Sequence, residues 1–173
     1  MSAREAGPIE RYLADDHLRL DALLRRATAA PALERAAFDA FRAGLLRHIA
    51  IEEKVLLPAA REARAGEPLA LARRLRVEHG AIASLLVPTP SHELVAEIRK
   101  ILEPHNALEE DPGGLYETCD ALLSGRAAEI VARMRAYPEV KVAAYNDGPR
   151  VLRTAEAALA QSAKQAEALA SRR

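Results

Sequence analysis

Two nearly identical motifs constrain the fold of this chain more than any other feature: HIAIEE at residues 48–53 and HNALEE at residues 105–110. In each motif a glutamate follows a histidine by four residues, and at about 3.6 residues per turn this spacing places the imidazole and the carboxylate on one helix face. Both motifs lie in helical patterns rich in Leu, Ile, Val and Ala, where an unpaired inward carboxylate would cost several kcal/mol. The motifs therefore face solvent or bind something, and two such pairs suit two metal ions.

The composition favours an all-α protein. Half of the 173 residues are apolar, with Ala and Leu dominant, and aromatic residues make up only 3%. Good helix formers without β-branched runs are typical of helical proteins. The length suits one domain with a substantial core and an appendage.

The charge balance and the single cysteine indicate which kinds of partner and which cellular compartment to expect. Lysine plus arginine and aspartate plus glutamate each number 25, so no net field attracts nucleic acid or an anionic membrane, and we expect neither as a partner. Cys119 cannot form an intrachain disulfide and fits a reducing compartment. The segment MSAREAGPIERYL lacks the apolar core of a signal peptide, and no stretch approaches the roughly 18–20 apolar residues that span a bilayer. We therefore expect a soluble, cytoplasmic protein.

Turn residues divide most of the chain into four amphipathic helices. We expect these helices over residues 9–30, 32–64, 68–87 and from the capping residue Ser91 to the DPGG sequence at 111–114. Pro58 should kink the second helix, because proline lacks a backbone donor and crowds the preceding turn, and Pro104 should do the same in the fourth.

Four of the five histidines fall at matching levels of these helices. In an antiparallel hairpin, residues equally far from the turn lie at the same level, since each residue advances about 1.5 Å along its helix axis. The midpoints between successive members of the set His17, His48, His79 and His105 fall beside Pro31, near Gly66 and against the loop at residues 88–91; His92 lies outside the set. We predict an up-down-up-down antiparallel four-helix bundle over residues 1–124, with these histidines in one layer, and a C-terminal helical extension over residues 125–173.

The sequence also contains an internal repeat. DHLRLDALL from Asp16 and EHGAIASLL from Glu78 share a pattern, as the two HxxxEE motifs do, so the bundle should consist of two similar hairpins related by a pseudo-twofold axis. The predicted metal ligands are His17, His48, Glu52, His79, His105 and Glu109. Imidazole and carboxylate ligands suit iron, manganese or zinc, and a two-metal centre bridged by carboxylates is the natural use of two glutamates among four helices; we expect iron.

These motifs resemble those of the hemerythrin-like, HHE cation-binding family. The resemblance covers roughly residues 8–124 and rests on DH at 16–17, HxxxEE at 48–53, EH at 78–79 and HxxxEE at 105–110. It implies two non-haem iron ions in a four-helix bundle, with His17 and His48 on one side, His79 and His105 on the other, and Glu52 and Glu109 bridging the irons.

One departure from the family pattern shapes the expected function. Oxygen-carrying hemerythrins have a second histidine one turn after the third-helix histidine, and here that position is Ala83. One ligand fewer leaves a coordination position open to water, dioxygen, nitric oxide, peroxide or an exchanging iron. By resemblance, we expect a protein that binds a small ligand such as dioxygen or nitric oxide, in oxygen, nitrosative or iron sensing or in iron handling. The alternatives are a di-iron enzyme that consumes peroxide or nitric oxide, and a structural bundle that binds zinc or no metal.

Several acidic side chains are candidates for the surroundings of the site. Asp21 either orients a ligand or pairs with a nearby arginine as a solvated acid. Asp16 and Glu78 each precede a site histidine, point elsewhere around the helix and should be surface charges. Glu53 and Glu110 have either a role at the site, as their duplication suggests, or exposure at the edge of the bundle.

Two side chains beyond the fourth helix complete the set of candidates. Tyr116 and Cys119 would approach the site only if the chain folds back after Gly114. For Cys119 we expect a small, buried, apolar side chain instead.

The last helix is expected to run from Pro149, which suits a first helical turn, nearly to Arg173. Its residues Leu152, Ala155, Leu159, Ser162, Ala166 and Leu169 recur with alternating spacings of three and four, the seam of a close-packed coiled coil. A helix this rich in alanine needs a surface to pack on. It either joins two copies of the chain as a homodimer or folds back across the bundle.

Overall fold

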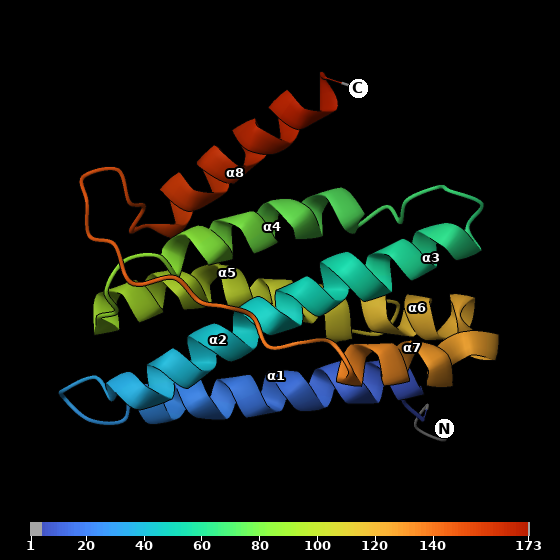
Figure 1. The fold of residues 1–173 in the computed structure, drawn as a ribbon, viewed down its shortest axis with the longest axis horizontal. Helices are drawn as coiled ribbons and strands as arrows, with labels where there is room; N and C mark the ends of the chain where they lie inside the picture. The colour runs from blue at the N-terminus through green and yellow to red at the C-terminus, as the bar shows by residue number, and fades with distance from the viewer. Residues whose placement is uncertain (1–4, 173) are drawn as a thin grey trace.

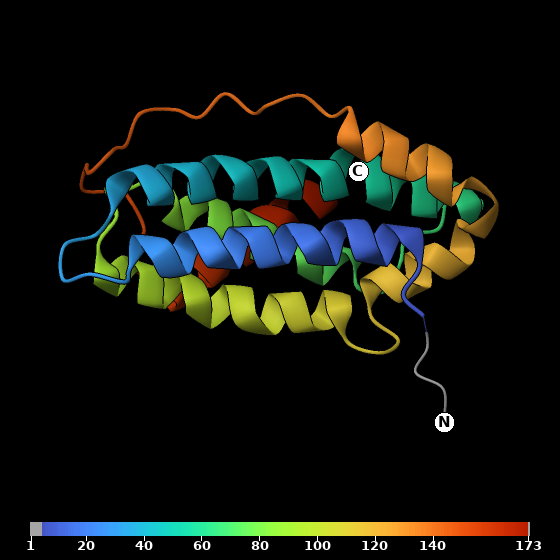
Figure 2. The same cartoon turned by 90° about the horizontal axis from the view of Figure 1, so that it is seen from below.

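The computed structural model describes residues 5–172, and all regular structure in that range is helical. The elements are α1 (Pro8–Ala27), α2 (Arg35–Ile51), a π-helical turn (Glu52–Leu56), α3 (Leu57–Ala63), α4 (Ala72–Leu85), α5 (His92–Glu110), α6 (Leu115–Leu122), a 3-10 turn (Ser124–Arg126), α7 (Ala127–Arg135) and α8 (Ala155–Ala170). Helices α1, α4, α5 and the continuous α2–α3 segment lie along the long axis of the molecule, and α6 and α7 lie at one end (Figures 1 and 2). No helix in the described range is both long enough and apolar enough to cross a bilayer.

The predicted helices form, with three of their starts displaced; the second helix begins at Arg35 instead of residue 32. Ser91 caps α5 as expected, with its side chain accepting a hydrogen bond from the Leu94 N–H at 3.2 Å. The third helix begins at Ala72 instead of residue 68, because a tight turn closed by the Ala72 N–H on the Leu69 carbonyl precedes it. The prediction that the last helix begins at Pro149 was wrong. It begins at residue 155, where the Thr154 side chain accepts a hydrogen bond from the Ala157 N–H.

The distortion expected near Pro58 takes the form of a wide turn. The Leu57 N–H bonds to the Glu52 carbonyl, five residues back, which is the π-helical pattern. A proline in a regular helix crowds the carbonyl four residues before it, and the wide turn lies directly ahead of Pro58. The helical path therefore continues from α2 into α3, and Glu52 stands where the wide turn begins. Pro104 lies inside α5, which runs on to Glu110.

The apolar core consists of two clusters, and the histidine positions lie between them. On α1, Leu13 belongs to the first cluster and Leu20 to the second, with His17 between them. On α4, Leu75 and Ile82 flank His79 in the same way. The same alternation on α2 places one polar layer across an otherwise apolar interior, and the buried apolar residues of α5, which precede His105, belong to the second cluster alone.

The segment after α7 returns along the outside of α2. Residues 138–147 form no regular structure, and Figure 2 shows them running beside α2 toward its N-terminal end. Arg47 donates a hydrogen bond to the Tyr137 carbonyl at 2.7 Å, and Arg42 donates to the Ala143 carbonyl at 3.0 Å while stacking on the Tyr145 ring. These arginines hold the segment against the bundle.

Helix α8 then folds back onto α4, which is one of the two arrangements predicted for it (Figure 1). Ala158 is fully buried and Ser162 nearly so, whereas Leu169, at the far end, is 63% exposed. Gly80 on α4 permits the close approach, since a Cβ there would lie 2.4 Å from Ser162 Oγ. A homodimer through this helix stays a prediction, which the solution mass of the intact chain would test.

The packing of α8 predicts a position-dependent cost of enlarging its alanines. Ala158→Leu should lower the free energy of unfolding by about 1–3 kcal/mol, because added methylenes do not fit a filled interface. Ala160→Leu, on the exposed side of the same helix, should change it by less than about 0.5 kcal/mol. Urea denaturation of both variants measures the difference, and equal effects would contradict the packing of α8 on α4.

Candidate metal centre

The structure brings all six predicted ligands together in the centre of the bundle. The four histidines are at most 6% exposed, and Glu52 and Glu109 are fully buried. The rings form two pairs: His17 and His48 have centroids 4.5 Å apart, and His79 and His105 have centroids 4.8 Å apart. We call these the His17/His48 half and the His79/His105 half. His92 is the first residue of α5, away from this layer.

Each buried carboxylate spans the two halves. Glu52 Oε1 lies 3.4 Å from His48 Nε2, and its Oε2 lies 3.2 Å from His79 Nε2. Glu109 Oε2 lies 3.5 Å from His17 Nε2, and its Oε1 lies 3.1 Å from His105 Nε2. One oxygen of each carboxylate therefore faces each half, which is the arrangement required of a bridging ligand.

The donor geometry of the His79/His105 half fits a metal ion. Glu52 Oε2 and Glu109 Oε1 are buried oxygens that accept no hydrogen bond from any described residue, although each has a histidine nitrogen close by. Leaving such oxygens unsatisfied costs about 1–3 kcal/mol each, and more when they are charged. His79 Nε2 lies 3.1 Å from His105 Nε2, close to the roughly 3.0 Å expected between adjacent ligands with bonds of about 2.1 Å.

The potential ligand atoms form two overlapping groups. Those of Glu52, His79, His105 and Glu109 lie within 4.8 Å of one another, and so do those of His17, His48 and Glu109. The assignment of these six residues as metal ligands stays a prediction, and the geometry is compatible with it.

A carboxylate from another helical segment holds the outer nitrogen of every site histidine. The Nδ1 contacts are His48 with Asp16 at 2.9 Å, His105 with Glu78 at 2.8 Å, His79 with Glu53 at 2.9 Å, and His17 with Glu110. Such a partner fixes the ring orientation and keeps Nε2 directed at the centre. The four contacts follow the internal repeat, because Asp16 and Glu78 are equivalent to each other, as are Glu53 and Glu110.

The prediction that Asp16 and Glu78 are surface charges was wrong. Each points away from the histidine beside it in the sequence, as expected, but reaches the histidine of the neighbouring helix. Glu53 and Glu110 each contact a histidine of the layer, as their duplication suggested, and Glu110 is also exposed at the edge of the bundle. Asp21 instead pairs with Arg25 at 2.6 Å on the bundle surface, so the solvated-acid interpretation of that residue holds.

Buried charge governs the titration of the layer when no cation is bound. Burial lowers the pKa of His48, but the Glu52 and Asp16 carboxylates outweigh it and raise the pKa to about 10. Burial likewise lowers the pKa of His105, but the nearby Glu109 and Glu78 carboxylates outweigh it and raise the pKa to about 10. Burial raises the pKa of Glu52, but the neighbouring His48 and His79 hold it well below its usual range. Histidine protons thus balance the buried carboxylates, a role that a metal cation would take over.

Tyr116 also enters the centre, the arrangement that the sequence made conditional on the chain folding back after Gly114. Its hydroxyl donates to Glu52 Oε1 at 2.7 Å and lies 3.1 Å from Glu109 Oε2. It is 3.2 Å from His17 Nε2 and 3.3 Å from His48 Nε2. Burial and the two carboxylates raise the pKa of this phenol well above its usual range.

The chain reversal at DPGG delivers Tyr116, and Asp120 on the same helix secures it. Asp120 accepts hydrogen bonds from the Ile9 N–H at 3.0 Å and the Glu10 N–H at 2.9 Å, so it caps the N-terminus of α1. The DPGG turn was readable in the sequence, but the side on which α6 packs was not. Cys119 is fully buried, as expected, and burial with the nearby Glu52 charge raises its pKa to about 12.

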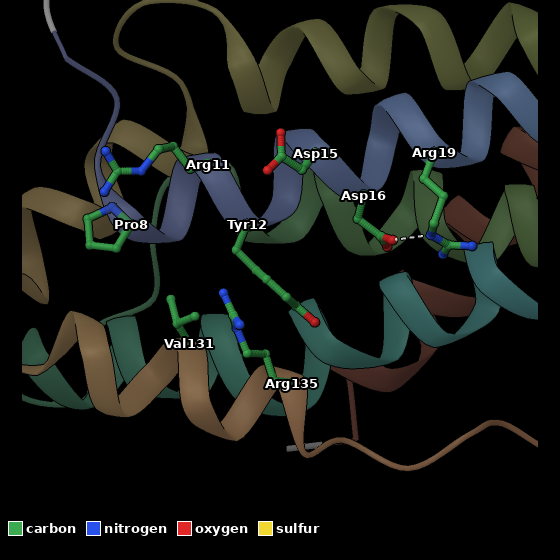
Figure 3. Close-up of a pocket in the computed structure, with 8 residues that line it drawn as sticks. All are labelled: Pro8, Arg11, Tyr12, Asp15, Asp16, Arg19, Val131 and Arg135. Carbon is green, nitrogen blue, oxygen red and sulfur yellow. Dashed lines mark hydrogen bonds and ion pairs between the residues drawn. The ribbon is translucent and has the colours of Figure 1, made fainter.

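A surface pocket of about 440 Å³ lies behind the His17/His48 half (Figure 3). It lies between α1 and α7, and its lining residues are Pro8, Arg11, Tyr12, Asp15, Asp16, Arg19, Val131 and Arg135. Asp16 is the link between this pocket and the centre, because one of its oxygens binds Arg19 at 2.8 Å and the other binds His48. The carboxylate that orients His48 is thus partly open to solvent.

Comparison with known proteins identifies one family. A family model described as Hemerythrin HHE cation binding domain matches residues 9–112. The match begins in α1 and ends just beyond α5, so it includes all six candidate ligands and excludes Tyr116. Comparison with curated proteins and with solved structures gives no match.

The raised histidine pKa values predict how stability depends on pH after metal is removed by chelation. His48 and His105 have pKa values near 10 in the fold against about 6.5 in the unfolded chain. Their protonation therefore stabilises the fold fully below about pH 6.5, and that contribution is lost as the pH rises toward 10. Urea denaturation should show the free energy of unfolding falling across this range. Metal-loaded protein should lack this decline, and identical profiles would contradict the assignment.

The outer carboxylates predict a loss of metal affinity without loss of a ligand. Glu78→Gln should weaken metal binding about 10- to 100-fold, because the amide no longer holds His105 as a charged acceptor. Glu103→Gln, on the exposed side of α5, serves as the matched control and should bind metal like the parent chain. Competition with a chromophoric chelator measures both affinities. Equal affinities would show that the contact to His105 does not support the site.

Proposed function

The chain belongs to the hemerythrin HHE cation binding domain family, and on this premise we propose that it is a non-haem di-iron protein that binds a small ligand. The proposed architecture is an up-down-up-down antiparallel four-helix bundle with the two irons side by side in its polar layer. The proposed ligands are His17, His48, Glu52, His79, His105 and Glu109. Glu52 and Glu109 would bridge the irons, each giving one oxygen to each half.

The observation that carries this proposal is the paired geometry of the layer. Both buried carboxylates span two histidine pairs, and four outer carboxylates hold the four Nδ1 atoms. A bundle that needed only a core would be more stable with apolar residues at these positions, since buried charges are costly. Nitrogen and oxygen donors in this number suit iron, although zinc and manganese share the preference for them.

Bound iron would supply affinity for dioxygen, nitric oxide or peroxide. The chain's own residues set where that ligand can bind. Ala83, one turn after His79 on α4, offers no donor atom where oxygen carriers of the family have a histidine, so the His79/His105 half keeps a position for an external ligand. The apolar clusters on both sides of the layer limit the access of bulk water.

The proposed role is sensing of oxygen, nitrosative stress or iron, or iron handling, in the cytoplasm. The single cysteine and the balanced charge support a reducing compartment and a small-molecule partner. A catalyst that consumes peroxide or nitric oxide would use the same centre. Turnover with either compound would assign the chain to that class.

Metal content tests the proposal directly. The intact chain, purified without air, should contain about two irons by mass spectrometry, and exposure to air should produce a new absorption band in the visible spectrum. A double variant, His79→Ala with His105→Ala, should lose at least one iron. Zinc in the purified protein, or no iron after reconstitution, would show that the layer is structural and would overturn the di-iron assignment.

A further inference from the structure

The two halves of the centre differ in one respect that the internal repeat does not explain. The Tyr116 hydroxyl lies against the His17/His48 half, where it contacts both histidines and one oxygen of each bridging carboxylate. The two carboxylate oxygens that accept no hydrogen bond, Glu52 Oε2 and Glu109 Oε1, face the His79/His105 half. Seven residues after Glu109 the chain has Tyr116, whereas seven residues after Glu52 it has Ala59, which carries no donor atom.

We propose that Tyr116 is a further metal ligand, bound through its phenolic oxygen to the ion held by His17 and His48. This proposal rests on the di-iron assignment above and deepens it. The half then has five protein donors: His17, His48, Glu52, Glu109 and Tyr116. The His79/His105 half keeps four donors and is the more open of the two.

The distances around the hydroxyl support coordination. The Tyr116 oxygen lies 2.7 Å and 3.1 Å from the two carboxylate oxygens and 3.2 Å and 3.3 Å from the two histidine nitrogens. An octahedral ion with bonds of about 2.1 Å has adjacent ligand atoms about 3.0 Å apart. The oxygen thus stands at the spacing of a ligand adjacent to all four donors.

The placement of the side chain supports it as well. Tyr116 is fully buried, so its hydroxyl has no access to solvent as an alternative partner. Asp120, one turn further along α6, is fixed to the N-terminus of α1, which also carries His17. The tyrosine and the histidine therefore sit on elements that are fastened together, as a rigid ligand set requires.

Coordination exchanges one bond of the phenol for another. The O–H bond breaks, the oxygen–metal bond forms, and the proton leaves to the buffer, as the proton of a cysteine thiol does when its sulfur binds a metal. The hydrogen bond from Tyr116 to Glu52 is lost in the exchange, and the Glu52 oxygen binds the same cation.

Optical and Raman spectroscopy of the intact, iron-loaded chain test the proposal. Ferric iron bound to a phenolate should give a visible charge-transfer band and resonance-enhanced tyrosine ring vibrations. Both signals should disappear in Tyr116→Phe and persist in Tyr137→Phe, which removes the same hydroxyl from a position outside the layer. Iron content is measured on every sample. If Tyr116→Phe does not fold, ring-deuterated tyrosine in the parent chain should shift the enhanced vibrations.

The outcomes separate this proposal from the one on which it rests. Two irons per chain without a phenolate signal would overturn the assignment of Tyr116 and leave the di-iron centre standing. A phenolate signal that persists in Tyr116→Phe would also overturn it. A chain that binds no iron at all would overturn the di-iron centre first, and the assignment of Tyr116 with it.

Discussion

The contacts between histidine Nδ1 atoms and carboxylates of other helical segments are the interactions on which the rest of the structure depends. The bundle buries two glutamates in a layer of four histidines, an arrangement that would be costly if the side chains were free to turn. Asp16, Glu53, Glu78 and Glu110 remove that freedom, because each fixes a ring that belongs to another segment. The same four contacts tie the helices to one another, so site geometry and helix register support each other.

Backbone irregularity lies next to this layer and not at random. The π-helical turn begins at Glu52 and ends at Leu56, shortly before Pro58. The DPGG turn comes directly after Glu109 and Glu110. Wide helical turns are often found at functional sites, because they displace a side chain from its regular position. After the second HxxxEE motif, α5 ends at Glu110 and the chain turns at DPGG, so α6 packs back against the bundle and brings Tyr116 to the centre. The two repeats thus share their ligand types but differ in the backbone on the C-terminal side of each HxxxEE motif.

The sequence predicted the helices and the common level of the histidines, because spacing along a helix is a local property and the turn residues mark where each helix ends. It also predicted all six residues that gather in the layer. It did not predict the partners of Asp16 and Glu78, since a side chain's neighbours on another helix depend on the rotation of both helices. The approach of Tyr116 depends likewise on how α6 packs after a turn whose direction the sequence leaves open. The start of α8 was misplaced because Pro149 suits a turn as well as it suits a first helical turn.

The cap that Asp120 forms on α1 has a consequence for the order of folding. Asp120 is separated along the chain by 111 positions from Ile9 and by 110 positions from Glu10. Most contacts of a helical bundle are local by comparison and form quickly. Closing so long a loop carries an entropic cost that must be met before the contact forms. The docking of α6 should therefore be a late event, after the hairpins have assembled. Since Tyr116 lies one turn from Asp120, the histidines and glutamates would meet before the tyrosine arrives, and the nascent site would pass through a stage more open than the finished one.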